Sequence, residues 1–125
     1  MFRYIISGII GMTVSLVCIL PPIIHFVTGP LAPFIGGIVG GLRVKSNKKG
    51  AVVIGLTIGI LLSGVIFSIG MLINSLGVSL PSIISDYASK DIINTSNLVK
   101  LATLIFIYSS VLGSIGAIIA GKIKK

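Results

Sequence analysis

The sequence predicts an all-α integral membrane protein, a helical bundle with four transmembrane segments. No charged side chain occurs between Lys49 and Asp86. Residues 51–76 inside this window are almost wholly apolar, and a spanning helix needs roughly 20 such residues. Of the 125 residues, 54% are hydrophobic and 10% are charged, against about 25% charged residues in soluble domains. A soluble core of this size could not bury so much apolar surface. We therefore expect a single transmembrane domain over residues 1–125.

The first forty residues predict a helical hairpin with short arms. Residues 4–20 form the first apolar segment, which we interpret as a retained helix because no small-residue cleavage site follows it. Prolines at 21, 22, 30 and 33 remove backbone donors and predict a turn over about 21–32. Residues 30–43 form the second segment. This segment is short for a full crossing, so a re-entrant arrangement remains open beside the hairpin.

Two longer segments follow in the second half of the chain. The third is residues 51–76 and the fourth is residues 101–120. The stretch 77–100 between them is comparatively polar and is predicted to be a loop, with a short interfacial helix over about 81–89. Asn94 begins an Asn-Thr-Ser triplet in this loop, which is an acceptor pattern for N-glycosylation.

The charge distribution predicts the orientation in the membrane. The formal net charge is +8, which in a soluble protein would suggest nucleic-acid binding. Here most of the basic residues flank apolar segments instead, so we expect no nucleic-acid partner. By the positive-inside rule, four crossings of a cell membrane leave both termini in the cytoplasm. The same basic residues are candidates for contact with anionic lipid headgroups, namely Arg43, Lys45, Lys48, Lys49, Lys122, Lys124 and Lys125.

Small residues recur at helical spacing in three of the segments. Between helices in lipid, association depends on close backbone approach, which small residues four positions apart permit. Two interpretations stay open: these faces pack the helices of one subunit together, or they form the interface of a homo-oligomer. The candidate packing residues are Gly36, Gly37, Gly40, Gly41, Gly55, Gly59, Ser63, Gly113 and Gly116.

The glycine pattern also carries a family resemblance. The chain carries, in this order, Gly29-Pro30, Phe34-Ile35-Gly36-Gly37, Gly40-Gly41, a basic loop, Gly50 and Gly55. This order resembles a family of small uncharacterised archaeal membrane proteins with four predicted helices. The resemblance implies a glycine-rich helical bundle and no known activity.

No motif in the chain has the strength of a catalytic signature, so we expect no enzyme, cofactor or metal site. His25 is the one residue that titrates near neutral pH, and its place near the proline-rich turn favours an interfacial anchor. We expect a structural or accessory membrane protein that packs through glycine-rich faces into a homo-oligomer or a larger membrane complex. The alternative is a minimal transporter or channel of oligomerised hairpins, which a polar cavity lined by Ser63, Tyr108, Ser110 or His25 would favour.

Overall fold

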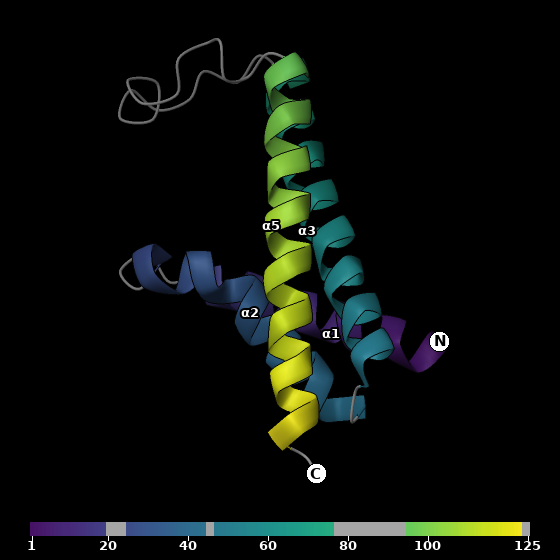
Figure 1. Ribbon diagram of the computed structural model, residues 1–125. Coiled ribbons are helices and arrows are strands. Elements are labelled where there is room, and N and C mark those ends of the chain that lie inside the picture. The colour runs from purple at the N-terminus through teal and green to yellow at the C-terminus, as the bar shows by residue number, and fades with distance from the viewer. Residues whose placement is uncertain (20–24, 45–46, 77–94, 124–125) are drawn as a thin grey trace.

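The computed structural model describes residues 1–19, 25–44, 47–76 and 95–123, and these confirm the all-α class (Figure 1). Its helices are α1 (Phe2–Ile19), α2 (His25–Val44), α3 (Lys48–Leu76) and α5 (Thr95–Ile123). Three of them, α1, α3 and α5, are long and apolar enough to cross a membrane. Helix α2 is not among these three, so the fourth crossing stays a prediction.

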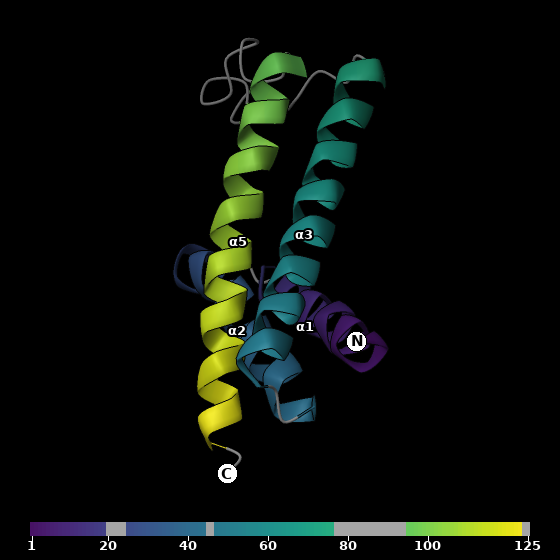
Figure 2. The same cartoon turned by 45° about the vertical axis from the view of Figure 1, so that its right-hand side comes forward.

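The helices form two crossed hairpins. Helices α3 and α5 run side by side in opposite directions along the length of the molecule (Figures 1 and 2). Helices α1 and α2 lie at a steep slant across the lower half of that pair. Helix α2 contacts all three other helices, whereas α1 and α5 do not contact each other within the described residues. The upper half of the α3–α5 pair therefore extends beyond the α1–α2 hairpin.

One glycine face of α2 packs against α1. A Cβ atom built on Gly40 would lie 2.7 Å from the carbonyl oxygen of Ser7, and one built on Gly11 would lie 2.5 Å from that of Gly36. Real Cβ atoms essentially never come within 3.0 Å of such atoms. The two backbones are thus in direct contact, and only glycine allows this separation.

The neighbouring glycine face of α2 packs against α5. Gly37 lies against the backbone of Gly113, and a Cβ on Gly41 would lie 2.8 Å from the Cα atom of Ala117. From the first pair to the second, the residue number rises by four in both helices, so α2 and α5 are locally parallel. Two Gly-x-x-x-Gly patterns offset by one residue therefore serve two different neighbouring helices.

Helix α3 meets α5 through its own glycines. A Cβ on Gly55 would lie 2.5 Å from the carbonyl oxygen of Ser110, and one on Gly59 would lie 2.9 Å from that of Phe106. The fully buried side chains gather beside these contacts, where α2 meets the α3–α5 pair. The hydrophobic core consists of Ala51, Ile54, Ile58 and Ala117.

The expected turn over residues 21–32 is wrong from residue 25 onward, because α2 begins at His25 and contains Pro30 and Pro33. Proline inside a membrane helix is tolerated where neighbouring helices supply hydrogen bonds to the local backbone. The Tyr108 hydroxyl on α5 donates to the carbonyl oxygen of Pro30 at 2.7 Å. This bond joins the proline-containing part of α2 to α5, whereas the carbonyl groups that lose a helical donor are those four residues before each proline.

Two further side chains bond the same part of α2 to α1. The Ser15 hydroxyl shares its proton between the carbonyl oxygens of Gly11 and Ala32, each 2.9 Å away. The Thr28 hydroxyl donates to the carbonyl oxygen of Cys18 at 2.7 Å. That oxygen belongs to the last turn of α1, where carbonyl groups lack a partner within the helix.

The two long helices begin earlier than the predicted residues 51 and 101. Asn47 caps α3, because its side-chain oxygen accepts a hydrogen bond from the Gly50 N–H at 2.7 Å, a typical N-cap contact. Helix α5 begins at Thr95 because Leu98 is buried and packs against Gly70. The predicted interfacial helix over 81–89 lies outside the described residues.

We predict that Gly37→Ala destabilises the protein while Gly64→Ala does not. The added methyl group at residue 37 would collide with the backbone of Gly113, whereas a Cβ at Gly64 meets nothing within 4 Å. Overpacking of this kind costs about 1–3 kcal/mol, and Ala in an open helical position gains up to about 1 kcal/mol over Gly. Unfolding in mild detergent, followed by circular dichroism, measures the difference. Equal stabilities of the two variants would contradict the contact.

We also predict that Tyr108→Phe lowers the free energy of unfolding by about 0.6–1.7 kcal/mol, the range for hydrogen bonds between membrane helices. The change removes only the hydroxyl that bonds Pro30. Tyr4→Phe is the matched control, because Tyr4 contacts Gly50 through ring carbons that Phe retains. The same unfolding measurement should find the control unchanged.

Candidate functional site

The basic side chains of the described residues, apart from Lys100 near the start of α5, gather towards one end of the molecule. Arg3 lies at the start of α1, Arg43 in the last turn of α2, and Lys122 in the last turn of α5. Lys48 and Lys49 begin α3. The N-terminus, the junction of α2 with α3 and the C-terminus all lie in the lower part of Figure 1. The remaining candidates for headgroup contact, Lys45, Lys124 and Lys125, lie outside the described residues.

Two cavities occur at this basic end. One, of about 290 Å³, is lined by Met1, Tyr4, Asn47, Lys49, Gly50 and Val53. The other, of about 150 Å³, is lined by Arg3 and Ile6 of α1 and by Arg43 and Val44 of α2. Arg43 was predicted from the sequence as a lipid contact but Arg3 was not, since a single charge near the N-terminus gives no signal for its partner.

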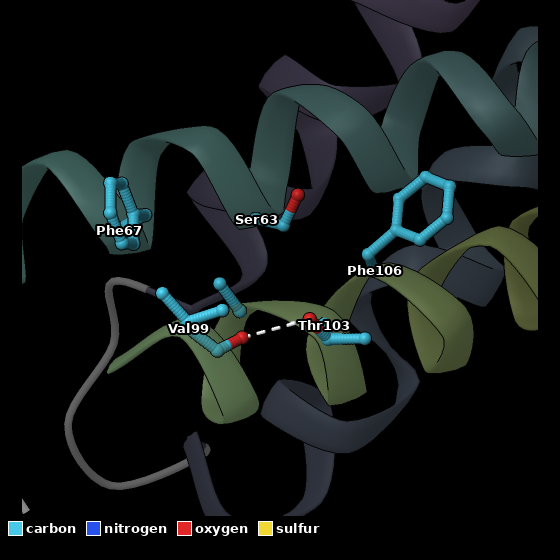
Figure 3. Close-up of a pocket in the computed structure, with 6 residues that line it drawn as sticks. Ser63, Phe67, Val99, Thr103 and Phe106 are labelled. Carbon is cyan, nitrogen blue, oxygen red and sulfur yellow. Dashed lines mark hydrogen bonds between the residues drawn. The ribbon is translucent and has the colours of Figure 1, made fainter. Parts of the chain in front are cut away.

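A third cavity is a groove of about 340 Å³ between the upper parts of α3 and α5 (Figure 3). Its hydroxyl groups are engaged within their own helices: Ser63 donates to the Ile60 carbonyl at 3.1 Å, and Thr103 to the Val99 carbonyl at 2.8 Å. The groove therefore presents a mainly apolar wall. Its lining residues are Ser63, Phe67, Val99, Ala102, Thr103 and Phe106.

The candidate packing glycines lie at contacts between helices of the same chain. The two glycine pairs of α2 and the pair of α3 occupy the positions described above. On α5, Gly113 lies beside Gly55, and Gly116 lies against the carbonyl group of Phe34. Ser63, which continues the α3 series, instead lines the groove (Figure 3).

Sequence reasoning missed the contact face of α1. Ser7, Gly11 and Ser15 are all buried and lie four residues apart. This is the same small-residue spacing that identified α2 and α3, so the signal was present. Gly8 also belongs to this helix, and a Cβ on it would lie 2.6 Å from the Cβ of Thr57 on α3.

The polar side chains weighed as a pore lining have different surroundings. Tyr108 bonds α2, Ser63 bonds its own helix, and the Ser110 hydroxyl lies against Gly59. The hydroxyls of Ser7, Ser109 and Ser110 are buried with no hydrogen-bond partner among the described residues. The side chain of His25 and the whole of Asn94 lie outside the described part of the chain.

Neither a metal-binding group among the described residues nor a known relative adds to this description of the site. Within the described residues, no group of three or more His, Cys, Asp and Glu side chains could hold a metal ion. No protein-family model matches the chain, and neither does any curated protein or solved structure. The resemblance to the archaeal family therefore stays a prediction.

We predict that single cysteines at Lys48 and Lys122, in a Cys18→Ala background, are labelled from one side of the membrane. A cysteine at Thr95 should be labelled from the opposite side. All three residues are exposed at helix ends, and α3 and α5 are antiparallel. An impermeant maleimide added to right-side-out and inverted vesicles measures this. Labelling of Lys48→Cys and Thr95→Cys from the same side would contradict the orientation.

Proposed function

We propose that this chain is a small multi-pass membrane protein of structural or accessory type, which self-associates or attaches to a larger membrane complex. One observation carries the proposal. The Tyr108, Ser15 and Ser63 hydroxyls bond backbone oxygens, and the largest groove described above is mainly apolar. Such an interior suits a scaffold better than a path for ions.

The arrangement in the membrane that we propose has four segments with both termini in the cytoplasm. Helices α3 and α5 contain 29 residues each, hence about 43 Å of helix, enough to cross a hydrocarbon core about 30 Å thick with tilt. The α1–α2 hairpin lies at a slant across the basic half of this pair, so its shorter helices would enter the membrane obliquely. The basic end faces the cytoplasm by the positive-inside rule.

The surface available for association differs from the one that the sequence suggests. The glycine faces are occupied by contacts within the chain, so a partner has to bind elsewhere. The upper half of the α3–α5 pair offers Gly64, which is open, beside the apolar groove. Helix α5 also exposes an apolar stripe with the spacing of a helix-packing face, formed by Leu104, Ile107, Val111 and Ile115.

The transporter alternative receives less support from the same residues. A selective path needs fixed charges, carbonyl rings or polar lining. The only two acidic residues, Asp86 and Asp91, lie outside the described residues. The Ser63 hydroxyl bonds its own helix and the Tyr108 hydroxyl bonds α2, so both have a role in helix structure and packing that needs no ion path.

We predict that the parent protein runs as a defined oligomer or complex by native mass spectrometry and crosslinking in mild detergent. Gly64→Phe should shift it to the monomer without loss of helical content, because the new ring fills the open surface. Val52→Phe places the same side chain at another exposed position of α3 and should leave association unchanged. A strictly monomeric parent with pH-dependent ion flux in proteoliposomes, abolished by His25→Gln, would instead establish the transporter alternative.

A further inference from the structure

The cavity between Arg3 and Arg43 has the composition of an anion-binding site. Two guanidinium groups from different helices line a space of about 150 Å³, together with the apolar side chains of Ile6 and Val44. Both arginines are exposed, so the cavity opens to the surface. No carboxylate side chain is present among the described residues, because both acidic residues of the chain, Asp86 and Asp91, fall outside them.

The packing of α1 against α2 fixes this pair of arginines. The two helices are antiparallel, with Gly36 against Gly11 and Gly40 against Ser7. One further turn in the same register brings the end of α2 opposite the start of α1, where Arg43 meets Arg3. The glycine contacts therefore determine the spacing of the two charges, and the site does not depend on a flexible loop.

The chemistry of the pair favours a phosphate group as the ligand. Two like charges beside one small cavity repel each other, and an anion between them removes that repulsion. Guanidinium groups bind phosphate oxygens through paired N–H donors. Arg3 also lies in the first turn of α1, which begins at Phe2, so the partial positive charge of that helix end adds to the potential near the site.

We propose that Arg3 and Arg43 together bind a phosphate group, supplied either by a membrane phospholipid or by free inorganic phosphate. Ile6 and Val44 give the cavity an apolar wall, which suits the glycerol and acyl part of a lipid. The site lies at the end of the bundle that also carries Lys48, Lys49 and Lys122, where headgroups of the cytoplasmic leaflet would be met. This inference uses the membrane location but not the association role, so either can fail without the other.

The test is a lipid titration of the delipidated protein in a mild, uncharged detergent, followed by native mass spectrometry. The probes are phosphatidylglycerol, diacylglycerol and sodium phosphate. We expect saturable binding of phosphatidylglycerol, no binding of diacylglycerol, and about a tenfold weaker affinity in Arg3→Gln and in Arg43→Gln, the scale of one lost charge-assisted hydrogen bond. Lys100→Gln removes one exposed charge away from the cavity and should change the affinity little.

The outcomes separate the sources and decide the proposal. If sodium phosphate displaces phosphatidylglycerol from the parent but not from either arginine variant, free phosphate is a ligand of the site. If sodium phosphate does not displace the lipid, the phospholipid is the ligand. Arg3→Lys and Arg43→Lys keep the charge and the fold, and they should still bind less tightly because they lose the paired donors. An equal loss in Lys100→Gln, or unsaturable binding to the parent, would overturn the proposal.

Discussion

The fold depends on the direct backbone contact between α2 and its two neighbours. Between helices in lipid there is no hydrophobic driving force, so stability comes from van der Waals contact and hydrogen bonds. Gly36 and Gly40 give α2 one bare face towards α1, while Gly37 and Gly41 give it another towards α5. Within the described residues α1 and α5 do not touch. Helix α2 therefore joins the α1–α2 hairpin to α5, and α1 adds a second connection through its contacts with α3, such as Gly8 against Thr57.

The same contacts determine where the functional groups lie. Antiparallel packing of α1 on α2 brings Arg3 to Arg43. Parallel packing of α2 on α5 carries Arg43 and Lys122 to the same end. The proline-containing turns of α2 lie farther up, where Tyr108 donates to the Pro30 carbonyl. Close packing thus brings Arg3, Arg43 and Lys122 to one end, while Ser15 and Tyr108 within the bundle donate to backbone oxygens of α2.

The sequence was sufficient for the helical class, for the location of each long apolar segment and for the glycines of α2, α3 and α5. Those features depend on local composition and on a fixed helical period. It was not sufficient for the start of α2, since two prolines predict a turn while this helix passes through both of them, packed against and bonded to α1 and α5. Arg3 was missed because its partner is 40 residues away, and the register of two helices joins them. The glycine faces left two interpretations open, because the pattern is the same within one chain and between chains.

The most direct test of this account is the spatial proximity of Gly37 to Gly113 and of Gly36 to Gly11 in a lipid bilayer. Solid-state NMR on a glycine-labelled sample detects such contacts without altering a side chain. The account predicts cross-peaks for both pairs that persist when the labelled protein is diluted into unlabelled protein, because each contact lies within one chain. Cross-peaks that disappear on dilution would show that the glycine faces join separate copies, and their absence in both samples would contradict the packing of α2 altogether.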